Sequence, residues 1–177
     1  LSGVFAGLAA LIGAGYVYWL FKKNGINYFD GERNIFSKDL VQHLLLAGLI
    51  ILVVAISSGY FFTAQKSKRA GLKIWDSTTK RLLLNFLIPL ISGGIFCLAM
   101  LYHGMFVFIA PATLIFYGFA LVNASKYTLT DVQFLGYLEI GLGLISLFFL
   151  GWGLLFWTIG FGVLHIVYGL VMHKKYK

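Results

Sequence analysis

The sequence predicts an all-α integral membrane bundle of six transmembrane helices. Hydrophobic residues make up 60% of the chain and charged residues 11%, whereas soluble domains are roughly half apolar and a quarter charged. The apolar residues occur in runs of about 20, the length that a helix needs to cross the hydrocarbon of a bilayer. Lys and Arg stand at the ends of these runs, as membrane orientation requires. We therefore expect a single transmembrane bundle over residues 1–177.

The apolar runs are separated by connections that are polar or contain Gly. The predicted spans cover about residues 1–21, 40–63, 77–102, 105–125, 131–151 and 154–172. The chain starts at Leu1 inside an apolar run, without Met or a charged leader segment. We therefore expect it to have been trimmed at its start.

Charged and aromatic residues delimit the first three spans. Trp19 followed by Lys22 and Lys23 marks the exit of the first span through a membrane interface. The loop over residues 64–81 holds six basic residues and a single acid, Asp76. Asp is a favoured N-cap residue, so Asp76 is expected to begin the third helix.

Two prolines fall within predicted spans. Pro89 lies in the interior of the third span, where it cannot donate to the helix ladder and clashes with the carbonyl oxygen of Asn85. We therefore expect a kink at Pro89 that leaves this carbonyl in need of a partner. Pro111 falls in an early turn of the fourth span, where a helix tolerates it.

The first, fifth and sixth spans each carry a face of small residues, which lets helices approach closely in lipid. The fifth span holds the only deep carboxylate, Glu139, on such a face, within an arc of about 80°. His165 shares a similar face of the sixth span, within about 60°. The predicted helix-packing residues are Gly3, Gly7, Ala10, Ala14, Gly136, Gly143, Gly162 and Gly169.

The distribution of Lys and Arg predicts the orientation of the bundle. With six spans, ten of the fourteen basic residues fall on the side of the second loop and the C-terminal tail. The positive-inside rule makes that side cytoplasmic, with both termini on it. A five-span alternative places the basic second loop and the basic tail on opposite sides, so it is less favoured.

Three polar residues are candidates for binding a ligand or a proton: Glu139, His165 and Asn85. Each lies about 12 Å from the predicted cytoplasmic end of its span, so the three can share one layer. Glu139 is either neutral, donating to Asn85 or the freed carbonyl, or ionised beside protonated His165. The alternative to a binding site is that these polar residues only form hydrogen bonds between helices, each worth about 0.6–2 kcal/mol.

Other functional classes lack support in the sequence. The net charge of +8 is explained by orientation, so no nucleic-acid partner is expected. Phosphate loops, catalytic motifs and a carboxylate pair within the spans are missing from the sequence, which favours a protein that is not an enzyme. No metal or cofactor is expected. His43 and His103 are the remaining candidates for holding one, without nearby Cys or acids in support.

Two stretches, Trp75 to Gly94 and Ala110 to Gly118, resemble a group of uncharacterised small multi-span bacterial membrane proteins. The resemblance implies location in the bacterial inner membrane. It implies no activity and no functional residues.

Two functions from different classes remain open. In the first, the protein is a membrane sensor, scaffold or accessory subunit whose Gly and Ala faces pack against a partner protein or a second copy in the bilayer. In the second, it is a small transporter or channel-like module that binds a proton, cation or small polar solute at Glu139, His165 and Asn85. The small number of polar residues in the spans favours the first function.

Overall fold

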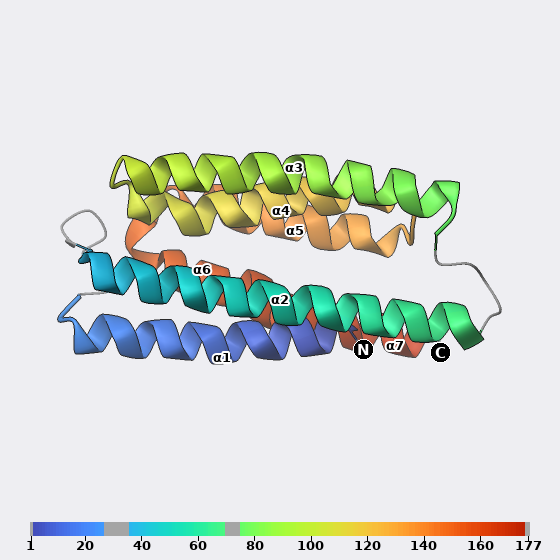
Figure 1. Cartoon of the computed structure of the whole chain (residues 1–177), viewed down its shortest axis with the longest axis horizontal. Coiled ribbons are helices and arrows are strands. Elements are labelled where there is room, and N and C mark those ends of the chain that lie inside the picture. Colours follow the sequence, from blue (N-terminus) through green and yellow to red (C-terminus); the bar gives the residue numbers. More distant parts are fainter. Residues whose placement is uncertain (1, 27–35, 70–74, 176–177) are drawn as a thin grey trace.

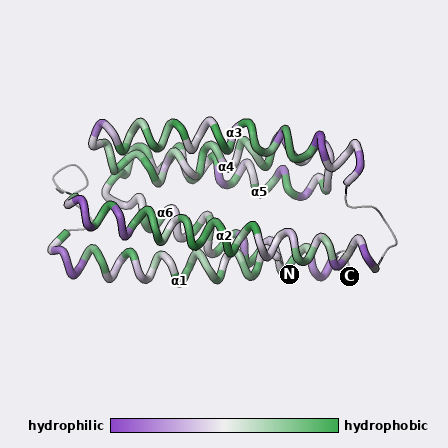
Figure 2. The backbone as a smooth tube through the Cα atoms, in the orientation of Figure 1, coloured by the Kyte–Doolittle hydropathy of each residue, from purple (hydrophilic) through white to green (hydrophobic). Residues whose placement is uncertain are grey.

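The computed structural model describes residues 2–26, 36–69 and 75–175, and these residues form helices and turns without any strand. The long helices lie side by side and run alternately in opposite directions (Figure 1). Hydrophilic residues gather at the ends of the helices and hydrophobic residues along their middles (Figure 2). The architecture is therefore all-α.

Seven α-helices make up most of the described chain. Their bounds are α1 Ser2–Lys23, α2 Lys38–Arg69, α3 Ser77–Tyr102, α4 Ile109–Ser125, α5 Asp131–Ser146, α6 Gly153–Trp157 and α7 His165–Lys175. A 3₁₀ turn over Phe106–Phe108 precedes α4, and another over Leu150–Trp152 precedes α6. The π-helical segment Thr158–Leu164 joins α6 to α7 in one continuous helical rod.

Five helices in the described part of the chain are long and apolar enough to cross a membrane. They are Ser2–Lys23, Lys38–Gln65, Ser77–Tyr102, Phe106–Ser125 and Leu150–Lys175. The fifth predicted span, expected over residues 131–151, is a shorter helix, because α5 ends at Ser146 after 16 residues. At about 24 Å, α5 is shorter than the roughly 30 Å of bilayer hydrocarbon.

The helices form two groups that meet along one side. In the first group, α1 packs against α2 and also against α7 and the π-helical segment. In the second group, α4 packs between α3 and α5. The groups are joined where α6 and the π-helical segment contact α4 and α5, and the N- and C-terminal ends lie at the same end of the array (Figure 1).

The small-residue face of α1 packs against the C-terminal rod of the same chain. A Cβ atom placed on Gly7 would lie 2.6 Å from the carbonyl oxygen of Gly162, and one on Gly3 would lie 3.1 Å from that of His165. Ala10 and Ala14 on this face are buried. This face of α1 therefore packs against α7 and the segment before it.

The small-residue face of α5 packs against α4. A Cβ atom on Gly136 would lie 2.8 Å from the carbonyl oxygen of Gly118, and one on Gly118 would lie 2.7 Å from that of Gly136. A Cβ atom on Gly143 would lie 3.0 Å from the carbonyl oxygen of Pro111. The two backbones thus touch along the pair, which holds the Glu139 face of α5 in a fixed position.

Helix α3 begins as predicted and continues through its proline. Asp76 is the N-cap, because its Oδ1 accepts a hydrogen bond of 2.7 Å from the backbone N–H of Thr79. This hydrogen bond holds the pKa of the Asp76 carboxyl below its usual value. The helix is uninterrupted from Ser77 to Tyr102 although Pro89 lies inside it.

The contact between α4 and α5 generates a test by substitution. We expect Gly136→Ala to destabilise the fold by about 1–3 kcal/mol, because the added methyl meets backbone and overpacks the interface. Gly141→Ala on the same helix is the matched control, since a Cβ atom there has nothing within 4 Å. Unfolding of both variants in detergent by denaturant titration measures the difference. Equal midpoints for the two variants would contradict the packing described above.

Candidate functional site

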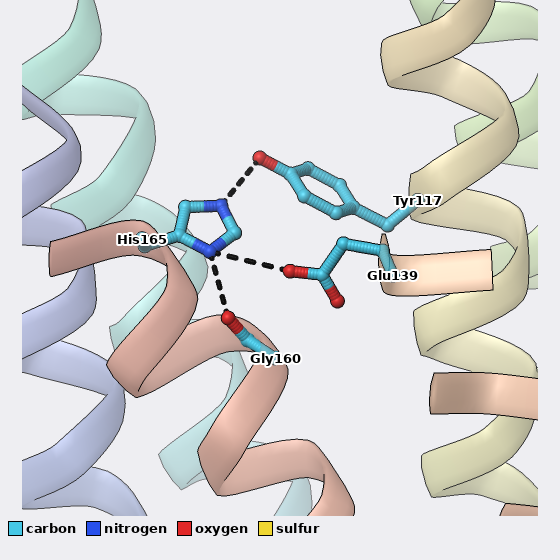
Figure 3. Close-up of polar contacts among 4 residues, drawn as sticks. All are labelled: Tyr117, Glu139, Gly160 and His165. Carbon is cyan, nitrogen blue, oxygen red and sulfur yellow. Dashed lines mark hydrogen bonds and ion pairs between the residues drawn. The ribbon is translucent and has the colours of Figure 1, made fainter. Parts of the chain in front are cut away.

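Three polar side chains from three helices meet where the two helix groups join (Figure 3). Glu139 comes from α5, Tyr117 from α4, and His165 is the first residue of α7. Glu139 is 0% exposed and His165 is 6% exposed. The structure thus brings together two of the three residues that the sequence singles out, Glu139 and His165.

The imidazole of His165 is the centre of the cluster. Its Nε2 lies 2.8 Å from the hydroxyl oxygen of Tyr117. Its Nδ1 lies 3.0 Å from the carbonyl oxygen of Gly160 and 3.4 Å from Oε1 of Glu139 (Figure 3). The ring therefore links α4 and α5 to the C-terminal rod.

These contacts determine where the ring protons lie. The Gly160 carbonyl can only accept, so Nδ1 of His165 carries a hydrogen and donates it. In the neutral ring, Nε2 is then an acceptor and the Tyr117 hydroxyl donates to it. In the protonated ring, Nε2–H donates to the Tyr117 oxygen instead. The hydroxyl can turn to suit either state, so the site accommodates both protonation states of His165 without moving a heavy atom.

Two features of the C-terminal rod build the site. The π-helical segment Thr158–Leu164 ends directly before His165, and such widened turns are frequent at functional sites. At Gly160, a Cβ atom would lie 2.5 Å from Oε2 of Glu139 and 2.5 Å from Leu114. A glycine at this position therefore leaves the space that the carboxyl group occupies.

The carboxyl group of Glu139 is short of hydrogen bonds. Among the residues that the structure describes, neither Oε1 nor Oε2 has a hydrogen-bond partner, and Nδ1 of His165 is at ion-pair distance from Oε1. An isolated carboxylate is costly in an apolar interior. The pair is therefore least costly with no net charge, either as carboxylic acid beside imidazole or as carboxylate beside imidazolium. Of the two alternatives raised by the sequence, an ionised Glu139 beside protonated His165 fits this geometry. A neutral Glu139 that donates to Asn85 or to the carbonyl oxygen of Asn85 does not, because the carboxyl group has no hydrogen-bond partner among the described residues.

Asn85 does not join this cluster. Its side-chain amide donates a hydrogen bond of 2.8 Å to the carbonyl oxygen of Arg81, one turn earlier in α3. The third polar group beside His165 is Tyr117 instead. Sequence reasoning missed Tyr117, although a phenol in the middle of an apolar run, away from the interfaces where Tyr is common, is the signal that marks it.

The other histidines lie apart from the cluster. Nδ1 of His43 contacts the carbonyl oxygen of Asp39 at 2.7 Å within α2, and His103 is the C-cap of α3. Over residues 2–26, 36–69 and 75–175, no three His, Cys, Asp or Glu side chains gather as a set of metal ligands.

Comparisons of the chain with protein-family models, with curated proteins and with solved structures gave no match. Fold and site define the class of protein directly: its described residues form an all-helical array with five helices of membrane-spanning length and a buried Glu–His–Tyr cluster between two helix groups.

Removing the Tyr117 hydroxyl tests its contact with His165. We expect Tyr117→Phe to cost about 0.6–2 kcal/mol of stability, the range for a hydrogen bond between helices in a membrane. The matched control is Tyr137→Phe, because the Tyr137 hydroxyl is bonded to Gln133 on the exposed face of α5. Denaturant unfolding in detergent measures both variants. A cost no larger for Tyr117→Phe than for the control would argue against the contact.

The shared charge of the pair predicts how stability depends on pH. Adding a proton to the neutral Glu139–His165 pair leaves a buried positive charge, and removing one leaves a buried negative charge. Since both are costly in an apolar interior, we expect stability to pass through a maximum and to fall on both sides of it. Thermal unfolding in detergent across the pH range provides the measurement. The double variant Glu139→Gln, His165→Gln should flatten this maximum, and an unchanged profile would refute the pair as its cause.

Proposed function

We propose that the protein is a six-span membrane sensor, scaffold or accessory subunit of the bacterial inner membrane, in which the Glu139–His165 pair is a proton-dependent contact between two groups of helices. The observation that carries the proposal is that this buried pair, together with Tyr117, bridges α4, α5 and the C-terminal rod at the junction of the groups. When the Glu139–His165 pair gains or loses a proton, the contact between the two helix groups therefore changes.

The six-span topology has both termini on the cytoplasmic side. It is supported by the position of the two terminal ends at one end of the array (Figure 1) and by the excess of Lys and Arg at that end. Helix α5 makes the fifth of the six crossings despite its length, because it is paired along α4 and followed by the apolar turn before Leu150. A short span is accommodated by local thinning of the bilayer at modest cost.

The surroundings of Glu139 favour a sensor over a solute pathway. The carboxyl group is fully buried, and the space on one side of it is bounded by Gly160 and Leu114. A packed site of this kind can take up or release a proton, but it does not by itself form a route for a solute. The energy of the charge change is then available to shift the two helix groups relative to each other.

A partner protein or a second copy would meet the outer helices. The small-residue faces of α1 and α5 are already covered within the chain, by Gly162 and Gly118 respectively. Helices α2 and α3 instead present many exposed apolar side chains. The lipid bilayer and any membrane-embedded partner therefore share these two surfaces.

One observation favours the alternative of a transporter or channel-like module. Both carboxyl oxygens of Glu139 lack a hydrogen-bond donor within the described part of the chain, and such oxygens suit a bound proton or a small cation. This alternative requires water to reach Glu139 in a second arrangement of the helices.

Glu139→Gln separates the two functions. Spin labels at Ser57→Cys on α2 and Leu98→Cys on α3, both exposed positions, report the distance between the groups in a Cys97→Ala background. For a sensor, we expect this distance to change with pH in the parent protein and to stay fixed in Glu139→Gln, because the amide cannot exchange a proton. The matched control Asp39→Asn, an exposed carboxyl at the start of α2, should retain the response.

Liposomes that enclose a pH-sensitive dye measure proton flux through the protein and so test the transporter alternative. Proton or cation flux through the parent protein that is lost in Glu139→Gln would replace the sensor by the transporter. A distance that does not respond to pH in the parent protein, together with absence of flux, would overturn both.

A further inference from the structure

An open groove lies beside the face of α1 that packs against the C-terminal rod. Its volume is about 640 Å³, and it runs between the C-terminal half of α1 and the beginning of the C-terminal rod. Leu11, Gly15, Tyr18 and Lys22 line the wall on α1, and Trp152 and Leu155 line the facing wall. None of these residues belongs to the Glu139 cluster.

The length of the groove matches one leaflet of a bilayer. Leu11 and Lys22 are eleven positions apart on α1, which corresponds to about 16 Å along a helix. Half of the bilayer hydrocarbon is about 15 Å. The groove therefore extends from the middle of the membrane to the interface and ends there, at the basic residues that close α1.

Gly15 leaves the floor of the groove open. A Cβ atom on Gly15 would have nothing within 4 Å, whereas one on Gly7 of the same helix would lie 2.6 Å from backbone. Since the neighbouring wall residues Leu11 and Leu155 are apolar, this floor suits a hydrocarbon chain lying against the helix backbone.

The interfacial end of the groove carries a positive charge. The Nζ of Lys22 lies 5.6 Å from the centre of the Tyr18 ring, and in the described ranges no carboxylate lies within ion-pair distance of it. Trp152 stands on the facing wall, and Trp and Tyr are the side chains favoured at the headgroup level. An ammonium group at this depth attracts an anionic headgroup.

We propose that this groove binds one anionic phospholipid, with an acyl chain between α1 and the C-terminal rod and the phosphate beside Lys22. A helix of a partner or a second copy would be about 10 Å wide and would cross both leaflets, whereas the groove spans one. The combination of an apolar channel of leaflet length with a cation at its outer end is the complement of a lipid.

Fluorescence of Trp152 tests the proposal. The full chain carrying Trp19→Phe, Trp75→Phe and Trp157→Phe keeps Trp152 as its one tryptophan, and it is reconstituted in vesicles that contain lipids with brominated acyl chains. We expect brominated phosphatidylglycerol to quench Trp152 with about fivefold higher relative affinity than brominated phosphatidylcholine, the advantage of one lysine at an anionic headgroup.

Two substitutions separate the groove from general attraction to the membrane. Lys22→Gln should reduce the fivefold preference to about onefold. Lys23→Gln is the matched control and should keep it, because Lys22 lines the groove and Lys23 does not. Both lysines are exposed, so the variants should fold, and circular dichroism with gel filtration checks this.

Three results would overturn the proposal. The first is equal quenching by the two lipids in the protein with Lys22 intact. The second is loss of the preference on addition of inorganic phosphate at the concentration of the brominated anionic lipid, which would make the ligand a free anion. The third is protection of Trp152 from both lipids together with a cross-linked dimer, which would make a second copy the occupant.

Discussion

A carboxyl group enclosed by apolar helices is the constraint on which much of this structure depends. Glu139 is buried with an imidazole nitrogen 3.4 Å from one oxygen, and the surrounding backbone is arranged to permit that approach. Gly160 leaves the space for the carboxyl group, while contact of Gly136 with Gly118 fixes the face of α5 that carries it. The polar group, the glycines and the irregular turn are parts of one solution to the cost of burying an ionisable side chain.

The sequence predicts those features that depend on local chemistry. Apolar runs bounded by basic residues locate the long helices, and Asp76 marks the start of α3. On the small-residue faces, Gly7 and Gly136 make close backbone contacts. What the pattern leaves open is the neighbour of each face. In helices that are apolar all round, periodicity does not distinguish the side that meets lipid from the side that meets another helix.

The same limit explains what was missed at the site. Asn85 and Tyr117 are both polar residues within apolar runs, yet Asn85 is bonded to its own helix and Tyr117 reaches His165. The difference lies in the rotation of α3 and α4 about their axes, which packing determines. The π-helical segment before His165 is a second nonlocal feature, because it depends on fitting Gly160 against Glu139. An early end of α5 at Ser146 belongs with these, since the residues that follow are as apolar as those before.

One contact at the far end of the same two helices has a mechanical consequence. Lys175, at the end of α7, donates to both carboxylate oxygens of Asp131, at the start of α5, at 2.9 and 2.8 Å. This bond is partly exposed to water, unlike the inner one, so dissolved ions screen it. Helices α5 and α7 are thus joined by two contacts, the buried Glu139–His165 pair and the partly exposed Asp131–Lys175 ion pair. Raising the ionic strength weakens only the Asp131–Lys175 ion pair, so the two helices can then pivot about the Glu139–His165 contact.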